Sequence, residues 1–375
     1  MKSNEILRIC GTDYTDMTRR LLKEASLLDL IRAKGKGKNI KITIKPNLVT
    51  PSPADFGATT HTEIIEGIVT YLKEGGYENI TIMEGSWAGD STEEALEYCG
   101  YNALAARHNL KVIDTKKVPS VKVNVEGTGI NICKCVYETE FLINVPVLKG
   151  HCQVAMTCAI KNLKGLIPDS EKRRFHTMGL HKPIAYLGKA IPQDFIVVDN
   201  ICGDPDFEEG GRPLVKNRIL CAVDPVLTDL YAMDDLGLKR GSIPYMNLAQ
   251  EIGIGKCDPA TMVIRDIGEV DEVDTAATGR VLDVSYTVED ADSCSMCYAQ
   301  LIGVLDRLKE EGLLERLGDE RIAIGQGYRD KSAADTECRF GIGNCTKNLP
   351  HFVKGCPPEE DEIYEELKAY LLDKG

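Results

Sequence analysis

The sequence is poor in aromatic residues and in positive charge. It contains one Trp and seven Phe, and its formal net charge at pH 7 is −13. Proteins that bind nucleic acids present a basic surface to the phosphates, and those that bind single strands add aromatic rings on which bases stack. The composition therefore argues against a nucleic-acid partner. Hydrophobic residues make up 43% of the chain, which is ordinary for a globular protein with a large core.

Long hydrophobic runs are missing as well. No stretch reaches the ~18 apolar residues of a membrane-spanning helix. The opening residues MKSNEILRIC lack the apolar segment of a secretory signal. We therefore expect a cytoplasmic protein without a membrane partner. The sequence also lacks the glycine-rich dinucleotide motif after its first predicted strand and the Walker A phosphate loop, which argues against nucleotide binding by those routes.

Cysteine, in contrast, is abundant, with fourteen residues, five of them in the last quarter of the chain. In a cytosolic protein such cysteines are reduced thiols or metal ligands rather than disulfides. A C-x-x-C pair binds one metal centre from a single turn, and later cysteines close the site; a cysteine before proline also ends the ligand run of bacterial ferredoxins. The pattern favours an iron–sulfur cluster. A structural zinc site and ordinary buried or redox-active thiols are the alternatives.

We predict one cluster, of the 4Fe–4S type, with four cysteine ligands: Cys294, Cys297, Cys345 and Cys356. Cys345 and Cys356 each follow a glycine-containing turn that is able to bring backbone N–H groups toward the sulfur. Cys338 is followed by Arg339-Phe340 and has no such turn before it, so we expect it to lie outside the set of four ligands. Whether Cys338 replaces one of the four stays open at this point.

Strand and helix patterns alternate along the first 257 residues. Apolar runs predict strands at 40–45, 79–83, 141–148, 195–198 and 218–223, and helical patterns lie at 63–72, 92–108, 154–163 and 226–236. This alternation predicts an α/β fold with a doubly wound, mostly parallel sheet. We expect two parts, an α/β core domain at 1–257 and a C-terminal segment at 258–375 that carries the iron–sulfur cysteines. Residues 258–293 are expected to be irregular or β-rich.

Polar residues follow the predicted strands. The groups at the five strand exits are Lys45-Pro46-Asn47, Glu84-Gly85-Ser86, Lys149-Gly150-His151, Asp199-Asn200 and Asp224. Ligands of open α/β sheets bind beyond the carboxyl ends of the strands, so we expect these groups to meet at one edge. Thr60 and Glu63 fit a capping box at the start of a helix, whose N-terminus would offer an anion site. Plain capping is the alternative.

The densest polar stretch is 149–165. If its middle is helical, Thr157, Lys161 and Lys164 share one face, and His151 lies near the helix start. Two lysines and a threonine in this arrangement suit a carboxylate or phosphate ligand. A solvated helix face with scattered charge is the alternative.

These motifs resemble the bacterial and archaeal family called domain of unknown function 362. The resemblance covers roughly residues 40–240 and is carried by Lys45-Pro46-Asn47, Thr60, His151, Thr157, Lys161 to Leu166, His176, Val198-Asp199, Glu208 to Gly211 and Asp224-Pro225. It implies an iron–sulfur protein whose C-terminal cysteines replace the ferredoxin domain of some members, and a core distantly similar to the lactate racemase-like fold. Two departures are Asn200, where a small turn residue is expected, and the fifth thiol of Cys338.

We expect an anaerobic oxidoreductase that takes electrons from a donor protein and passes them to a small anionic substrate. The candidate catalytic residues are His151, His176 and Lys161, because imidazole titrates near cytosolic pH and lysine pairs with anions. The candidate substrate-binding residues are Lys45, Asn47, Thr60, Asn162 and Lys164. Two alternatives remain, a lyase or dehydratase whose cluster acts as a Lewis acid and a non-enzymatic cluster carrier.

Overall fold

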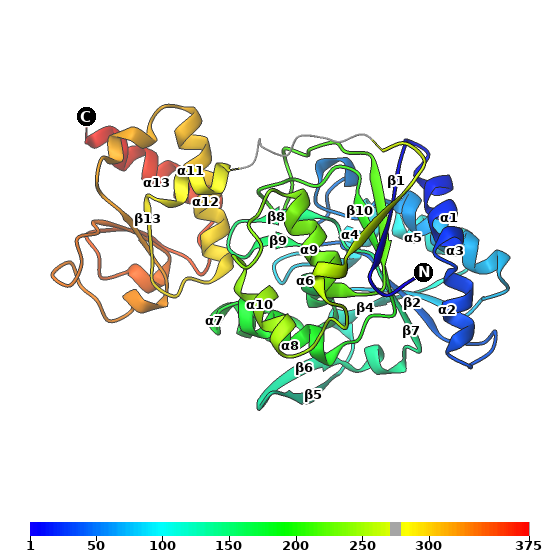
Figure 1. Cartoon of the computed structure of the whole chain (residues 1–375). Helices are drawn as coiled ribbons and strands as arrows, with labels where there is room; N and C mark the ends of the chain where they lie inside the picture. The colour runs from blue at the N-terminus through cyan, green and yellow to red at the C-terminus, as the bar shows by residue number, and fades with distance from the viewer. Residues whose placement is uncertain (271–278, 375) are drawn as a thin grey trace. The chain divides into compact units, whose positions relative to one another are not determined.

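The computed structural model of the chain describes residues 1–270 and 279–374. The chain divides into two compact units, the first made of Met1–Arg173 with His181–Ala277 and the second of Arg174–Leu180 with Thr278–Gly375 (Figure 1). We expected the first part to end at residue 257. Strand β12 (Val263–Ile267) instead pairs with β1 (Glu5–Cys10) and so belongs to the first unit. This pairing joins the two ends of the unit, which local sequence patterns do not reveal.

The first unit is a mixed α/β fold built on an eight-stranded, mostly parallel sheet. The strand order is β12-β1-β11-β10-β7-β2-β3-β4. The bounds of the other strands are β2 Ile42–Lys45, β3 Ile80–Glu84, β4 Lys111–Asp114, β7 Phe141–Asn144, β10 Phe195–Asn200 and β11 Arg218–Ala222. Strand β11 is antiparallel to both of its neighbours, β1 and β10, whereas the other neighbouring strands of the sheet run parallel. A small hairpin of β5 (Ser120–Val125) and β6 (Thr128–Cys133) stands apart from this sheet.

Helices cover both faces of the sheet. Figure 1 shows α1, α2, α3 and α5 on one side and α6, α8, α9 and α10 on the other. The helices are α1 Tyr14–Glu24, α2 Leu27–Ala33, α3 Thr62–Glu74, α4 Thr92–Tyr98, α5 Tyr101–His108, α6 Ala159–Asn162, α7 Asp169–Thr177, α8 His181–Ala190, α9 Pro225–Asp235 and α10 Pro244–Glu251. The helix expected over 92–108 is broken at Gly100, whose φ of 79° is left-handed and free of strain only for glycine.

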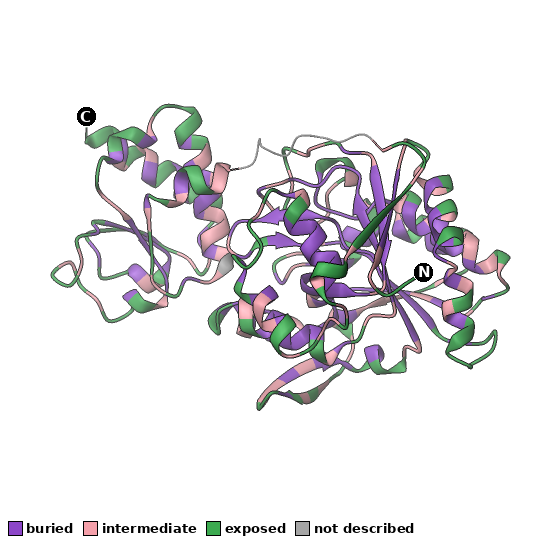
Figure 2. Ribbon diagram, viewed as in Figure 1, coloured by how far each residue is buried: buried purple, intermediate pink, exposed green. Residues whose placement is uncertain are grey.

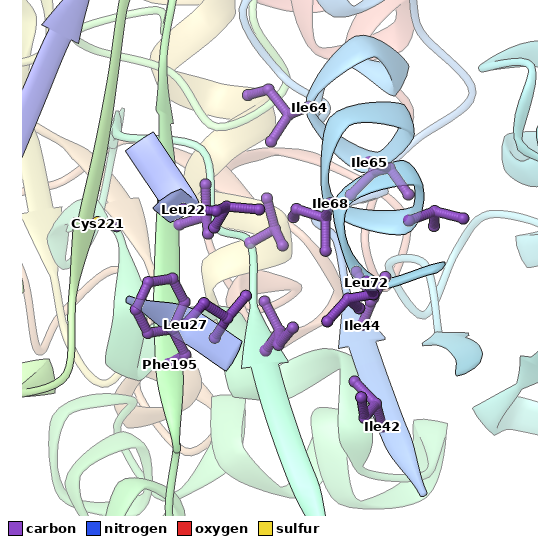
Figure 3. Packing of buried hydrophobic residues seen from close by; sticks show 14 of the residues in the cluster. Leu22, Leu27, Ile42, Ile44, Ile64, Ile65, Ile68, Leu72, Phe195 and Cys221 are labelled. Atoms are coloured by element: carbon purple, nitrogen blue, oxygen red, sulfur yellow. The ribbon is translucent and has the colours of Figure 1, made fainter. Parts of the chain in front are cut away.

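The sheet and the helices α1, α2, α3 and α5 enclose a large hydrophobic core. Figure 2 shows the central strands buried, and Figure 3 shows α3 side chains packed against strand side chains. Ile44 of β2 and Ile68 of α3 both have no exposed surface. Fully burying such a side chain contributes about 1.5–3 kcal/mol, so this packing holds the strands in place and positions the residues at their ends.

The helix expected over 154–163 is wrong for most of its length. Strand β8 (Lys149–His151) and strand β9 (Ala155–Thr157) form a hairpin, and only the single turn of α6 follows. Every second residue from Val154 to Ile160 is apolar and buried, a strand-like alternation that fits the same residues as a helical pattern. The Asp229 carboxylate then accepts the N–H groups of Ala159 and Ile160, which fixes the start of α6.

Asp224 lies at the other edge of the sheet from the remaining strand exits. Because β11 runs antiparallel to β10, its carboxyl end is opposite that of β10. The Asp224 carboxylate caps α9 through the N–H groups of Val226 and Leu227 and also accepts those of Lys256 and Cys257. Asp224 is therefore a structural residue, and the expectation that all five exits meet at one edge is wrong for this one.

The second unit contains a four-stranded sheet in which every pair of neighbouring strands is parallel. The strands follow in chain order as β13 Val288–Asp290, β14 Ile322–Ile324, β15 Phe340–Ile342 and β16 His351–Val353. Its helices are α11 Arg280–Ser285, α12 Ser295–Glu310 and α13 Glu360–Asp373, and α12 packs on both of the others. The carboxyl ends of all four strands consequently lie at one edge of this sheet. In the part of the chain described, no helix is long and apolar enough to cross a membrane.

Candidate functional site

Lys45 and Glu84 form a buried ion pair at the ends of the adjacent strands β2 and β3. The Lys45 Nζ atom lies 2.5 Å from Glu84 Oε2, and the two side chains are 1% and 3% exposed. The same ammonium group donates to the carbonyl of Pro46 at 2.8 Å and to Asn162 Oδ1 at 3.1 Å. Burial lowers the pKa of Lys45, and Glu84 offsets part of this effect. All three ammonium hydrogens have acceptors, so Lys45 holds the scaffold together.

The other residues expected to bind substrate near Lys45 also make interior contacts. Asn162 Nδ2 donates to Asn144 Oδ1 at 2.8 Å, which ties α6 to β7. The Thr60 hydroxyl donates to the carbonyl of Val145 at 2.9 Å and accepts the N–H of Asn47 at 2.8 Å. The residue that caps α3 is His61, so the capping box expected at Thr60 is wrong. Thr60 instead links the two loops that follow β2 and β7.

A second group of polar residues, which we call the basic cluster, contains Lys149, His151, Lys161, Lys164 and Glu208. Glu208 comes from the loop after β10, and its carboxylate contacts His151 Nε2 and lies 3.5 Å from Lys161 Nζ. The Lys161 ammonium also donates to Thr157 Oγ1 at 2.9 Å. The Lys149 ammonium donates to the carbonyls of Ala58 and Glu208. Lys161 is only 8% exposed, so the alternative of a solvated lysine on a helix face is wrong.

The lysines of the basic cluster repel one another, and the nearby acidic groups offset only part of the effect on Lys149. Burial lowers the pKa of Lys149 to about 7, and the neighbouring Lys161 adds to the effect. The pKa of Lys164 falls to about 7 for the same two reasons. Burial by itself would raise the pKa of Glu208, but His151 and Lys161 hold it well below its usual value. Three lysines surround this carboxylate, so the cluster is suited to an additional anion.

The two candidate acid–base histidines lie in different units. His151 Nδ1 accepts the N–H groups of Gln153 and Val154 at 3.1 and 3.3 Å, so the ring carries its proton on Nε2 and donates it to Glu208. Burial lowers the pKa of His151 to about 4, which keeps the ring neutral. His176 is buried on α7, in the 174–180 segment that groups with the second unit.

A third group of residues, around His61, was not found from the sequence. His61 Nδ1 lies 2.8 Å from Asp199 Oδ2, while Nε2 lies 3.3 Å from Asp55 Oδ1 and 3.8 Å from Cys202 Sγ. Burial lowers the pKa of His61, but Asp199 outweighs burial and raises it to about 12. These residues are far apart in the sequence and show no regular ligand spacing. The one available signal was Asp199 at a strand exit.

Four cysteines line one small cavity of the second unit: Cys294, Cys297, Cys345 and Cys356. They lie where the chain turns after the carboxyl ends of β13, β15 and β16. The turn before Cys345 needs a glycine for its backbone, because the φ of Gly343 is 82°. Cys338 lies elsewhere, in a hydrophobic cluster with Tyr328 and Leu349. The structure thus brings the four predicted ligands together and leaves the fifth thiol outside.

The surroundings of the cavity favour a thiolate at Cys294. Cys294 caps the N-terminus of α12, and Cys297 follows in the first turn. A hydrogen bond between these two thiols lowers the pKa of Cys294 to about 6, while the same bond and burial raise that of Cys297. The Cys345 sulfur also accepts a hydrogen bond from Arg329, which raises the pKa of the guanidinium. A positive charge and a helix N-terminus both stabilise negatively charged sulfur.

Taken together, the fold and the polar sheet edge define a mixed α/β protein with a buried basic cluster and a separate cysteine-lined cavity. The chain matches the family described as "Domain of unknown function (DUF362)" over residues 42–234, and it belongs to that family. It is 24% identical over 242 residues to the thylakoid-associated protein sll1697 of Synechocystis sp., a match that covers 61% of this chain and 75% of the relative.

A comparison with solved structures gives one further match. The lactate racemase apoprotein from Thermoanaerobacterium thermosaccharolyticum is similar with a TM-score of 0.42 and 16% sequence identity. The match covers 61% of this chain and 56% of that one.

Proposed function

We propose that the protein is an iron–sulfur protein that holds one 4Fe–4S cluster in its second unit. The observation that supports this most is the convergence of four thiols from three separate turns on one cavity. Iron–sulfur clusters of this type take four cysteine thiolates, and the number and kind of ligands both fit. The exclusion of Cys338 from the cavity agrees with a four-ligand site.

Four cysteine ligands favour one role for the cluster over another. When bound, such a cluster supplies one-electron transfer, and with every iron bound by a thiolate none is open to a substrate hydroxyl. We therefore propose an oxidoreductase rather than a lyase or dehydratase. Its electron donor would be another protein, and its setting an oxygen-poor cytoplasm. Cys356 is exposed and Cys294 and Cys345 are half-buried, so a donor could approach this edge of the second unit.

The substrate we propose is a small carboxylate or phosphate bound at the basic cluster of the first unit. Lys149 and Lys161 are buried there, Lys164 is half-buried, and Glu208 is shared among them. An anion would relieve the repulsion among the lysines and accept hydrogen bonds from them. His151 would orient Glu208, since its proton is already donated to that carboxylate.

The test of the cluster is the composition of the protein purified without oxygen. We expect about four iron and four sulfide per chain, a brown absorption that bleaches on reduction, and an electron spin resonance signal in the reduced protein. A colourless protein with one zinc and no sulfide would contradict the proposal and indicate a structural zinc site. Binding of inorganic phosphate and of short carboxylates, measured by calorimetry, tests the substrate class separately.

A further inference from the structure

Three potential metal ligands converge at the start of α3, outside the basic cluster and the cysteine cavity. Asp55 comes from the 3-10 helix η1 (Ala54–Phe56), His61 caps α3, and Cys202 lies in the loop after β10. One ligand atom from each residue lies within 4.8 Å of the other two. Gly57 makes this approach possible, because a Cβ there would lie 2.7 Å from the carbonyl oxygen of Cys202.

The histidine ring is oriented by a carboxylate on its far side. Asp199 Oδ2 accepts hydrogen bonds from both the backbone N–H and Nδ1 of His61, each at 2.8 Å. Asp199 Oδ1 in turn accepts the N–H of Ile201 at 3.1 Å, which fixes the carboxylate. Metal-binding histidines are commonly held in this way, with one ring nitrogen on a carboxylate and the other directed at the metal. Here the other nitrogen, Nε2, is directed at Asp55 and Cys202.

We propose that Asp55, His61 and Cys202 bind a divalent cation of the zinc class, with one coordination position left open. Thiolate, imidazole and carboxylate are the ligands that zinc takes, and three protein ligands with a vacancy are typical of its catalytic sites.

The distances agree with such a site. With Zn–N and Zn–O near 2.0 Å and Zn–S near 2.3 Å, the ligand atoms of a tetrahedral site lie about 3.3 Å apart for N···O and about 3.5 Å apart for N···S. The distance of 3.3 Å from His61 Nε2 to Asp55 Oδ1 equals the first value, and the 3.8 Å to Cys202 Sγ is a few tenths of an ångström longer than the second, so a small shift of the thiol completes the geometry. The Asp55 side chain is 93% exposed, so it is able to rotate toward the ion.

A simpler explanation is that His61 and Asp199 only anchor the start of α3. That role accounts for the hydrogen bonds of Nδ1 and of the backbone. An ion pair of the ring with Asp55 accounts for the carboxylate at Nε2, and the Cys202 thiol has the carbonyl of Ala54 as a second partner at 3.5 Å. The metal site differs from this explanation in requiring all three side chains at once, which the variants below test.

The experiment uses Co²⁺ as the probe, added without oxygen to the full-length protein. Cobalt bound to a thiolate gives a charge-transfer absorption, and Cys202→Ser is expected to lose the part of it that this site contributes. Cys221→Ser, which alters a buried cysteine of β11, should leave the spectrum unchanged. Cys297→Ser identifies any cobalt bound in the cysteine cavity of the second unit, so the two sites are separated. Identical spectra for Cys202→Ser and the unaltered protein would overturn the proposal.

Two further variants keep the test decisive if Cys202→Ser does not fold. Asp55→Ala changes an exposed side chain and is expected to weaken Co²⁺ binding at least roughly tenfold, with an unchanged melting temperature. Asp199→Asn keeps the size of the residue that orients His61 and should weaken binding roughly 10- to 100-fold. Unchanged cobalt affinity in Asp55→Ala would show that the three residues only pack together, and would overturn the metal site even if Cys202→Ser failed to fold.

Discussion

Gly165 lies so close to Glu84 that a Cβ at this position would be 1.8 Å from Glu84 Oε1. The same atom would lie 2.7 Å from Lys45 Nζ. Glu84 has no room to withdraw, because Oε2 is paired with Lys45 and Oε1 accepts the N–H of Gly85 at 2.7 Å. The small residue after Lys164 thus lets the 3-10 turn η4 (Leu163–Leu166), which follows α6, close over the buried ion pair.

The first prediction follows from this close approach. Gly165→Ala should displace Glu84 and break the pair with Lys45, since the new methyl group would overlap the charged ends of these two buried side chains. Breaking a buried ion pair costs about 3–5 kcal/mol, and we expect a loss of this order in urea unfolding. Gly303→Ala in α12 is the control, because its Cβ would meet only Glu360 at an ordinary 3.6 Å. Gly303→Ala should raise the free energy of unfolding by about 0.5–1 kcal/mol. Equal stability of Gly165→Ala and the unaltered protein would contradict the prediction.

Most of the sheet could be predicted from the sequence. Strands such as β2 and β10 are buried on both faces, so their apolar runs and their exits into polar residues were visible. The direction of β11 was not visible, because an apolar strand has the same pattern in a parallel and an antiparallel position. For this reason Asp224 was assigned to the wrong edge.

The sites could be predicted only where spacing carries information. The C-x-x-C pair and the glycine turns indicated the four cysteines that line the cavity, and the lysines of 149–165 indicated the basic cluster. The partners of these lysines are distant in sequence, however, and Glu208 was missed as their shared carboxylate. His61 was missed for the same reason, since its neighbours Asp199 and Cys202 approach it only in the folded chain.

The second prediction concerns the choice among the cysteines. Cys345→Ser should lose the cluster's absorption and most of its iron, because it removes one of four thiols on the cavity. Cys338→Ser is the matched control and should retain both, since this thiol lies among Tyr328 and Leu349. Iron and sulfide analysis of the two proteins, purified side by side without oxygen, checks the assignment. Loss of iron in Cys338→Ser with retention of iron in Cys345→Ser would mean that Cys338, and not Cys345, is the fourth ligand.

The third prediction is a dependence of stability on pH. Lys149 has a pKa of about 7 in the folded protein because of burial, against about 10.4 in an unfolded chain. Between these values the unfolded chain binds more protons than the folded one, so stability rises with pH in this window. The folded protein tolerates a neutral Lys149 well, because an amine retains two hydrogens for the carbonyls of Ala58 and Glu208.

Lys149→Met tests this dependence. The difference in unfolding free energy between the unaltered protein and the variant should grow in favour of the unaltered protein from pH 7 to 9. The slope should be at most about 1.4 kcal/mol per pH unit, the value for one proton. Lys161, Asp204 and Glu208 also act on Lys149 and are present in both proteins. Glu209 has a pKa of about 7 because of burial, and Lys149 lowers it, so both proteins carry Glu209→Gln for this comparison. A difference that stays constant with pH would show that Lys149 remains charged when buried.

The last prediction concerns Lys161, whose ammonium lies between Thr157 and Glu208. Lys161→Met keeps most of the side-chain volume and removes a charge-assisted hydrogen bond to a bound anion, worth roughly 1.5–3 kcal/mol. Binding of inorganic phosphate or of a short carboxylate should therefore weaken on the order of ten- to a hundredfold. Stability should change little. The substitution removes the attraction between Lys161 and Glu208, but it also relieves the repulsion that Lys161 exerts on Lys149 and Lys164.

Calorimetry with each anion and urea unfolding of the same samples check both parts of this expectation. Lys189→Met, which alters an exposed lysine of α8, is the control and should change neither property. Iron content should be the same in all three proteins, since the cysteine cavity lies in the other unit. If Lys161→Met binds anions as well as the control does, the basic cluster holds Glu208 for structural reasons and the substrate binds elsewhere. A variant that instead unfolds would show that Lys161 supports the fold through Glu208, because an unpaired carboxylate is costly to bury.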